Sequence, residues 1–337
     1  MSTLRRIARK ILLDEVAKPL IQPSPLVEVI ENSPTFHVMR FGKLNQERTF
    51  YIIRRSPGSG FFSNFAYVLN HLKICDSLGF TPAVDFENFP TLYNEQSPIN
   101  ATKNAWEYYF EPVSSYPLEE IYSSNSVVVT DGKWHSSMPM SITQDRQLLH
   151  VYNKYIKPNQ EILSDSNAFA NQHFTNEKVL AIHFRGQELR RARGHPFPPT
   201  KKQVLSRARS LISDQHFTKV FVSTESLDYL NFLEDSLSIS VCSFPSYRSN
   251  KNSYLEKPRD VHRYLLGRDI LVELLLMLKA DALLCGGSNV SETAAFLAQD
   301  KPSYYQRIWN GINSSNPLTA KYLWYLRAIL PAQLGGF

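Results

Sequence analysis

The second half of the chain alternates short apolar runs with segments in which apolar residues recur every three or four positions. The short runs predict β-strands, and the periodic segments predict α-helices. The expected strands are 178–184, 219–223, 239–242 and 282–285, and the expected helices are 200–212, 227–233, 265–278 and 288–298. Strands that alternate with helices form a parallel, doubly wound sheet, and such sheets bind ligands beyond the carboxyl ends of their strands.

The first half of the chain shows a looser version of the same pattern. Its expected elements are a strand at 49–54, a turn at 56–60, a helix at 65–78, strands at 81–85 and 126–130, and a helical region at 141–172. The first strand, turn, helix and second strand together form a βαβ unit. We therefore predict an α/β protein with two units, residues 1–175 and residues 176–337.

The net charge of +6 favours anionic ligands, which include nucleic acids, lipid headgroups and phosphorylated small molecules. The three cysteines lie far apart, so neither a disulfide framework nor a metal cluster is expected, and a reducing compartment such as the cytoplasm fits best. No apolar run reaches the ~18 residues of a membrane span. The longest, Ile270–Leu278, is interrupted by Glu273.

Residues 1–12 form a basic amphipathic pattern. Leu4, Ile7 and Ile11 fall on one helical face, and arginine and lysine residues surround it. Such a helix can lie on an anionic membrane surface. A helix that packs on the rest of its own protein shows the same pattern, so both alternatives stay open.

Unusual residues follow three of the expected strands. These segments are His183-Phe184-Arg185-Gly186-Gln187-Glu188, Ser223-Thr224-Glu225-Ser226 and Gly286-Gly287-Ser288-Asn289-Val290-Ser291. In a parallel sheet all three segments lie at the same edge. A single turn between a strand and a helix is common, but three such turns together indicate a site for a nucleoside diphosphate.

Each segment offers groups that suit a phosphate. Arg185 presents a fixed fork of donors, which is the geometry of bidentate phosphate binding. The segment 223–226 resembles a helix start with additional hydroxyl groups. Gly286 and Gly287 let the backbone approach a ligand closely, and the helix that begins near Ser288 favours an anion at its free N–H groups.

Several other functional motifs are absent. The sequence contains no phosphate-binding P-loop, no dinucleotide-binding glycine motif, no hydrolase nucleophile elbow and no zinc motif. His195 and His262 are candidate ligands or bases, although a single histidine beside a turn is more often structural. Arg190, Arg191 and Arg193 either serve the site or belong to a solvated loop. They lack the interleaved aromatic residues of single-strand platforms, so nucleic acid is not an expected partner.

The segment 182–188, Ile-His-Phe-Arg-Gly-Gln-Glu, resembles motif I of the fucosyltransferase superfamily, which includes α1,6-, α1,2-, rhizobial nodulation and protein O-fucosyltransferases. The shared element of that motif is His-x-Arg. Residues 267–294 resemble the C-terminal motif, in which an acidic helix leads to a strand that ends in Ser-Asn. Residues 220–226 and 59–72 resemble the intervening strand and the glycine-rich loop of the acceptor domain. The likeness spans roughly 55–300 and is closer in the second half.

The resemblance implies a GT-B fold, in which two Rossmann-like domains face each other across a cleft. It also implies a GDP-fucose donor held by the C-terminal domain, a glycan acceptor, and transfer with inversion and without a metal or other cofactor. Carried over by position, Arg185 grips the β-phosphate and His183 supports it. Asp269 and Asp281 match acidic positions that serve the guanine pocket or the structure. The expected donor-binding residues are His183, Arg185, Ser223, Thr224, Glu225, Asp269, Gly287, Ser288, Asn289 and Val290.

The chain departs from the family pattern around motif I. Gly186 replaces the second arginine, Glu188 replaces an aspartate, and arginines stand where α1,6 enzymes carry a catalytic glutamate. We expect Arg185 and Glu188 to be catalytic, the latter as base, with Asp85 and Glu95 as alternative bases. The aromatic stretch 106–110 either stacks on sugar rings or belongs to the core.

The alternatives to fucosyl transfer to a glycan are another nucleotide sugar, a protein hydroxyl acceptor, or a non-catalytic GT-B-like domain that binds glycans. The missing second arginine favours the last of these alternatives. The presence of Arg185 with Ser288 and Asn289 favours an enzyme.

Overall fold

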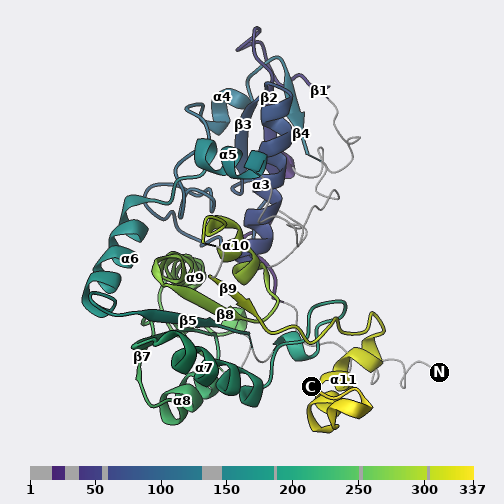
Figure 1. Ribbon diagram of the computed structural model, residues 1–337. Helices are drawn as coiled ribbons and strands as arrows, with labels where there is room; N and C mark the ends of the chain where they lie inside the picture. Colours follow the sequence, from purple (N-terminus) through teal and green to yellow (C-terminus); the bar gives the residue numbers. More distant parts are fainter. Residues whose placement is uncertain are drawn as a thin grey trace, which may run out of the picture.

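The computed structural model describes residues 17–26, 38–54, 60–130, 146–185, 188–249, 253–301 and 304–337 (Figure 1). It contains two β-sheets with helices packed around them, so the expected α/β class is confirmed. The first sheet, purple to blue in Figure 1, comes from the first half of the chain, and the second comes from the teal, green and yellow half. Residues 1–12, expected as a basic helix, and the turn at 56–59 lie outside the described residues.

The first sheet has the strand order β1-β4-β2-β3. Its strands are β1 (Val38–Met39), β2 (Phe50–Arg54), β3 (Thr81–Asp85) and β4 (Val127–Val129). Strand β2 is parallel to β3 and β4, and β1 pairs with β4 in antiparallel orientation. The helix α3 (Phe61–Ser77) connects β2 to β3, which confirms the predicted βαβ unit.

The second sheet has the order β7-β6-β5-β8-β9, and every neighbouring pair is parallel. Its strands are β5 (Val179–His183), β6 (Lys219–Ser223), β7 (Ser240–Cys242), β8 (Ala282–Cys285) and β9 (Tyr305–Arg307). All residues of the central strand β5 are buried, as expected for a parallel strand covered on both faces. The edge strand β9 was not predicted, because its sequence Tyr-Gln-Arg shows no apolar run.

Helices connect the strands of the second sheet where the periodicity predicted them. They are α7 (Lys201–Gln215), α8 (Leu227–Ser236), α9 (His262–Lys279) and α10 (Asn289–Leu297), and α11 (Pro317–Ile329) follows the last strand. A capping box between Thr200 and Gln203 fixes the start of α7. The expected helical region 141–172 contains α5 (Arg146–Tyr155) and α6 (Gln160–His173), while 141–145 lies outside the described residues. Among the helices of the described chain, none is long and apolar enough to cross a membrane.

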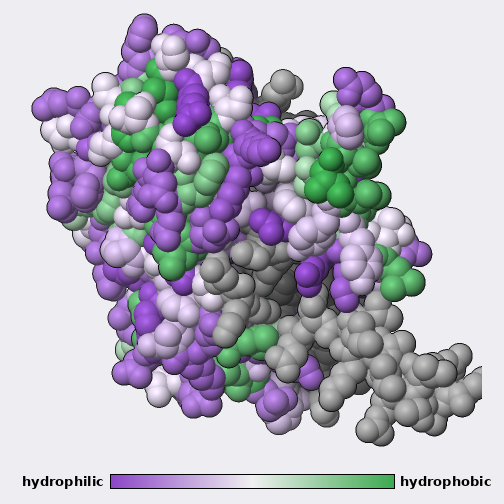
Figure 2. All heavy atoms as spheres, turned by 90° about the horizontal axis from the view of Figure 1, so that it is seen from below, coloured by the Kyte–Doolittle hydropathy of each residue, from purple (hydrophilic) through white to green (hydrophobic). Residues whose placement is uncertain are grey.

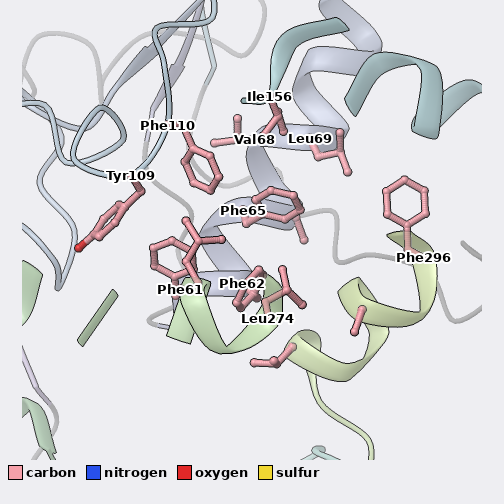
Figure 3. Close-up of a cluster of buried hydrophobic side chains, with 14 of the residues drawn as sticks. Phe61, Phe62, Phe65, Val68, Leu69, Tyr109, Phe110, Ile156, Leu274 and Phe296 are labelled. Atoms are coloured by element: carbon pink, nitrogen blue, oxygen red, sulfur yellow. The ribbon is translucent and has the colours of Figure 1, made fainter. Parts of the chain in front are cut away.

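A single hydrophobic cluster joins the two halves of the chain. The part drawn in Figure 3 combines Phe61, Phe62 and Phe65 of α3 with Leu274 of α9 and Phe296 of α10. Helix α6 precedes residue 175 but packs along α9, where its Asp165 pairs with Arg268. Core packing and an ion pair therefore cross the predicted boundary at residue 175. The division into residues 1–175 and 176–337 stays a prediction.

Polar contacts from the first half of the chain fix the start of α9. The Oε1 atom of Glu95 accepts a hydrogen bond from the backbone N–H of Tyr264 at 3.0 Å, and Arg263 donates to the backbone oxygen of Leu92 at 3.0 Å. The ring of Tyr264 stacks on Tyr109 with centroids 5.7 Å apart. A carboxylate at a helix N-terminus is favourable, because it accepts from N–H groups that have no partner within the helix.

The close packing of α9 against Tyr109 predicts the effect of one substitution. A Cβ atom at Gly267 would lie 2.5 Å from Cζ of Tyr109, whose ring is buried. We expect Gly267→Ala to lower the free energy of unfolding by about 1–3 kcal/mol, because overpacking outweighs the better helix propensity of alanine. Urea unfolding measures this change, with Asn231→Ala on the exposed side of α8 as the control. A more stable Gly267→Ala protein would contradict this packing.

Candidate functional site

Three strand ends meet at one edge of the second sheet, as predicted. Strands β6 and β8 flank β5, and both are parallel to it. His183, the last residue of β5, is paired in register with Ser223 of β6 and Cys285 of β8. The segments that begin at residues 183, 223 and 286 therefore leave the sheet side by side.

The side chain of His183 connects all three segments. It is 2% exposed, and its Nδ1 atom lies 3.0 Å from the hydroxyl of Ser223. Its Nε2 atom lies 3.3 Å from the hydroxyl of Ser288 on the other side. Burial, with a smaller contribution from the charge of Arg185, lowers the pKa of His183 to about 3. The imidazole is therefore neutral at physiological pH and acts as a hydrogen-bonding bridge.

A buried glutamate continues this chain of hydrogen bonds. The hydroxyl of Ser223 donates to Oε2 of Glu273 at 2.6 Å, and the other oxygen of Glu273 contacts Ser246 and Arg248, whose Nη2 lies 3.3 Å away. Burial raises the pKa of Glu273 to about 7, although Arg248 opposes the shift. Sequence reasoning missed the role of this residue. The available signal was a single carboxylate within the apolar run 270–278.

The hydrogen-bond directions assign the tautomer of His183 when Glu273 is ionised. Because Ser223 donates its proton to Glu273, its oxygen accepts from Nδ1–H of His183. The Nε2 atom then carries no proton and accepts from the hydroxyl of Ser288. The Ser288 hydroxyl is thus oriented toward the sheet.

Arg185 lies at the mouth of this network. Its Nε atom is 3.9 Å from Oε1 of Glu225, and the two side chains are 34% and 29% exposed. A partly exposed ion pair at this distance contributes little to stability, at most about 1 kcal/mol. The positive charge of Arg185 also acts on His195 and on Tyr93 of the first half of the chain. The arginine is therefore placed where an anion could replace Glu225 as its partner.

Ser288 is the N-cap of α10, as predicted for a helix that opens the third segment. Its hydroxyl accepts from the N–H of Ser291 at 3.2 Å, and the hydroxyl of Ser291 donates to the backbone oxygen of Gly286 at 2.7 Å. The N–H groups of Asn289 and Val290 belong to the same first turn, where a helix supplies no acceptors of its own. This turn is suited to an anion.

The two glycines before α10 are required by the protein's own packing. A Cβ atom at Gly286 would lie 2.7 Å from Cδ of Pro199, and one at Gly287 would lie 2.8 Å from Cβ of Pro196. The loop after β8 is thus pressed against the Pro-rich turn that follows motif I. Contact with this neighbouring turn explains why both positions carry glycine. Close approach of their backbone to a ligand stays a prediction.

The second segment and Asp269 are held by contacts within the protein. The hydroxyl of Thr224 accepts from the N–H of Ser226 at 3.3 Å and is buried. Asp269 is 5% exposed and pairs with Arg259 at 2.9 Å and with Arg268 at 3.5 Å. A role of Asp269 in the guanine pocket stays a prediction.

Asp281 lies at the wrong end of the sheet for a nucleotide pocket. Its Oδ2 atom accepts from the N–H of Val179, the first residue of β5, at 2.8 Å. The ligand edge begins at His183, which is about 13 Å away at the rise of a parallel strand. Of the two roles expected for Asp281, the guanine pocket or the structure, this contact supports the structural one. Its function is to join the N-terminal ends of two strands.

The alternative bases have structural partners. Asp85 is fully buried and accepts from the N–H of Asn88 at 2.8 Å and from the hydroxyl of Tyr122 at 2.7 Å. Glu95 binds the start of α9, as described above. The aromatic stretch 106–110 is part of the core, since Trp106, Tyr108, Tyr109 and Phe110 are each at most 3% exposed. Glu188 begins the short helix η2 (Glu188–Arg190), and its side chain lies outside the described atoms, as do residues 186–187.

In the described part of the chain, the two candidate histidines do not belong to a group of residues that could hold a metal ion. His262 donates from Nε2 to the backbone oxygen of Ser253 at 2.9 Å, and its Nδ1 accepts from Arg259 at 3.4 Å, so its role is structural. His195 is exposed. Within the described ranges, no group of three or more His, Cys, Asp or Glu residues could hold a metal ion.

The basic run after motif I divides between packing and solvent. Arg190 donates to the hydroxyl of Tyr229 at 2.8 Å and lies 4.5 Å above the ring of Trp324. Arg191 lies 5.8 Å from the ring centroid of Tyr325, and Arg193 is exposed.

The buried network predicts opposite pH dependences for two variants. Between pH 4.5 and 6.5 the unfolded chain protonates His183 and the folded protein does not, so this histidine lowers stability as pH falls. Glu273 acts in the opposite direction, because the folded protein retains a proton that the unfolded chain releases as pH rises. The two contributions offset each other in the wild-type protein.

We therefore expect Glu273→Gln to lose up to about 1.4 kcal/mol of unfolding free energy per pH unit on acidification from pH 6.5 to 5, relative to wild type. His183→Asn should gain a similar amount over the same range. Urea unfolding at pH 5, 6 and 7 provides the comparison. Equal pH slopes for the two variants would contradict the assigned protonation states.

Comparison with solved structures gives the fold. NodZ alpha-1,6-fucosyltransferase co-crystallized with GDP shares 16% sequence identity, aligns with 74% of this chain and 92% of its own, and has a TM-score of 0.50. Fucosyltransferase NodZ from Bradyrhizobium gives 16% identity, 70% and 88% coverage and a TM-score of 0.45. POFUT1 in complex with GDP-fucose shares 12% sequence identity, aligns with 79% of this chain and 99% of its own, and has a TM-score of 0.43. No family model and no curated protein matches the sequence. At this identity the first likeness establishes the fold, and the chain shares the fold of the NodZ fucosyltransferase.

Proposed function

We propose that the protein transfers fucose from GDP-fucose to a hydroxyl group of a glycan acceptor, with inversion and without a metal ion. One observation carries this proposal: a partly exposed arginine, a neutral buried histidine and a capped helix N-terminus meet at the carboxyl edge of one parallel sheet. The sheet belongs to a fold shared with a fucosyltransferase that was co-crystallized with GDP. The motif that carries Arg185 also resembles that of the fucosyltransferase superfamily.

The diphosphate would bind between Arg185 and the first turn of α10. The contact of Arg185 with Glu225 is long and partly exposed, so a phosphate could displace it at little cost. The N–H groups of Asn289 and Val290 would bind phosphate oxygens at the positive end of the helix dipole. His183 would position both segments, because it holds Ser288 from the sheet side.

In the reaction, the bond between the sugar C1 and the phosphate oxygen breaks as the acceptor oxygen attacks from the opposite face. Positive charge develops on the sugar ring, and negative charge grows on the departing diphosphate. Arg185 and the α10 amides are fixed before the reaction, so they stabilise that charge without reorganisation. One such donor lowers the activation barrier by about 2.7–4 kcal/mol in comparable sites.

The acceptor hydroxyl needs a base or accurate placement. We propose Glu188 as the base, because it follows Arg185 by three residues and begins the helix η2 at the same sheet edge. Asp85 and Glu95 are less suited, since their carboxylates already bind groups of the folded protein.

Nucleotide preference can be tested by thermal unfolding with GDP, UDP or ADP. A ligand at 100 times its Kd adds about 2.7 kcal/mol of stability, which should raise the midpoint by several degrees for GDP. Arg185→Ala should lose this shift, and Arg193→Ala, a matched change at an exposed arginine, should retain it. A shift with UDP alone would indicate another nucleotide sugar. No shift with any nucleotide would favour a non-catalytic glycan-binding domain.

Turnover provides a separate test of the role of Arg185. We expect Arg185→Ala to release GDP from GDP-fucose at least about 100-fold more slowly, because a pre-set donor to the leaving group is lost. The variant should fold normally, since the side chain is 34% exposed. Arg193→Ala and the addition of EDTA should leave the rate unchanged. Wild-type turnover in Arg185→Ala would reject the assignment of motif I, and loss of activity in EDTA would reject the metal-independent mechanism.

A further inference from the structure

Helix α11 has apolar residues on two opposite faces. Its inner face carries Ala320 and Trp324, which are buried, and the indole N–H of Trp324 donates to the backbone oxygen of Pro198 at 2.8 Å. This face attaches the helix to the turn that follows motif I. A surface helix usually needs only one apolar face to be stable, so the apolar outer face has another reason.

The outer face forms a continuous stripe. Its residues are Leu318 (58% exposed), Tyr322 (61%), Tyr325 (38%), Leu326 (51%) and Ile329 (80%). These positions follow the spacing i, i+4, i+7, i+8 and i+11, which places them within an arc of about 100° on an α-helix. Figure 2 shows hydrophobic residues gathered at the surface on the side of the molecule that carries α11 in Figure 1. We call these five residues the α11 stripe.

The surroundings of the α11 stripe are positively charged. The segment 189–199, which follows motif I, and the segment 317–337, which begins with α11, contain no aspartate or glutamate, and they contain five lysine and arginine residues. These cations are Arg190, Arg191, Arg193, Lys321 and Arg327. The guanidinium group of Arg191 lies over the ring of Tyr325, so positive charge reaches the stripe itself.

We propose that the α11 stripe docks the protein onto an anionic lipid bilayer. Tyrosine is favoured at the boundary between headgroups and acyl chains, and leucine and isoleucine gain free energy by entering that boundary. The surrounding cations are attracted to anionic headgroups. With 13 residues, α11 is shorter than the ~20 residues of a spanning helix and would lie in the plane of the membrane.

Charge also favours an anionic bilayer over a second copy of the chain as the partner of the α11 stripe. A symmetric dimer through the α11 stripe would bring the same positively charged segments against each other. Juxtaposed like charges disfavour such an interface, whereas an anionic bilayer complements it. The inference rests on the surface alone and is independent of the proposed enzymatic activity.

Membrane docking would also place the candidate site near the lipid surface. Helix α11 contacts η2, and Arg190 of η2 lies over Trp324 on the inner face of α11. The sheet edge at Arg185, which η2 follows in the chain, would therefore lie close to the bilayer.

Vesicle co-sedimentation of the full-length chain tests this inference. The test variant replaces Tyr322, Leu326 and Ile329 by serine. The control variant replaces Leu44, Leu78 and Leu227 by serine, which are 51%, 48% and 47% exposed elsewhere on the molecule. Vesicles of phosphatidylcholine with and without about 30% phosphatidylglycerol distinguish anionic from neutral lipid. Added salt should weaken the electrostatic contribution to vesicle binding. Thermal unfolding confirms that both variants fold.

We expect the wild-type protein and the control variant to bind anionic vesicles alike, and the test variant to bind at least tenfold more weakly. Equal binding of the test variant and the wild-type protein would overturn the inference, even if deletion of residues 1–12 abolished binding, because the contact would then lie elsewhere. Absence of wild-type binding would overturn it as well. A wild-type dimer that becomes a monomer in the test variant, measured by light scattering, would assign the stripe to a second copy instead.

Discussion

The buried imidazole of His183 is the interaction on which the candidate site depends. Adjacent parallel strands bring three loops to one edge, but sheet pairing alone leaves each loop free to choose its direction. His183 removes that freedom, because one ring nitrogen holds Ser223 and the other holds Ser288. Its neutrality is essential to this function, since a protonated ring would require both neighbours to accept. The apolar surroundings that lower its pKa therefore also maintain the geometry of the loops.

The carboxylate of Glu273 extends the same network into the core. A buried carboxylate that contacts an arginine and two hydroxyl groups is expensive to replace singly, because its partners would be left without acceptors. Such a network tolerates few arrangements of its members. We infer that it specifies the position of β6 and of the loop at Ser246 relative to α9. The hydrogen bonds and Arg248 offset part of the cost of burying the charge, and the remaining cost appears as the raised pKa of Glu273.

Much of the fold was predictable because parallel strands are buried on both faces. This burial gives β5, β6 and β8 the short apolar runs that the sequence displays, and the same argument placed residues 183, 223 and 288 at one edge. Strand β9 escaped prediction because an edge strand needs no apolar run. Glu273 escaped because the partner of a buried charge, here Arg248, is distant in sequence. The role of Asp281 stayed open between the guanine pocket and the structure, because a motif match does not tell which end of a strand a side chain reaches.

The contact between the glycines of the third segment and the prolines after motif I links two parts of the chain that are nearly 90 residues apart. Gly286 and Pro199, and likewise Gly287 and Pro196, have complementary shapes, and a side chain on either glycine would collide with a ring that cannot rotate away. Residues at these positions should therefore change together during evolution. Loops fixed in this way also lose little conformational entropy when a ligand binds, so more of the contact energy appears as affinity. A pair of small residues and a pair of rigid rings thus prepare a surface before any ligand arrives.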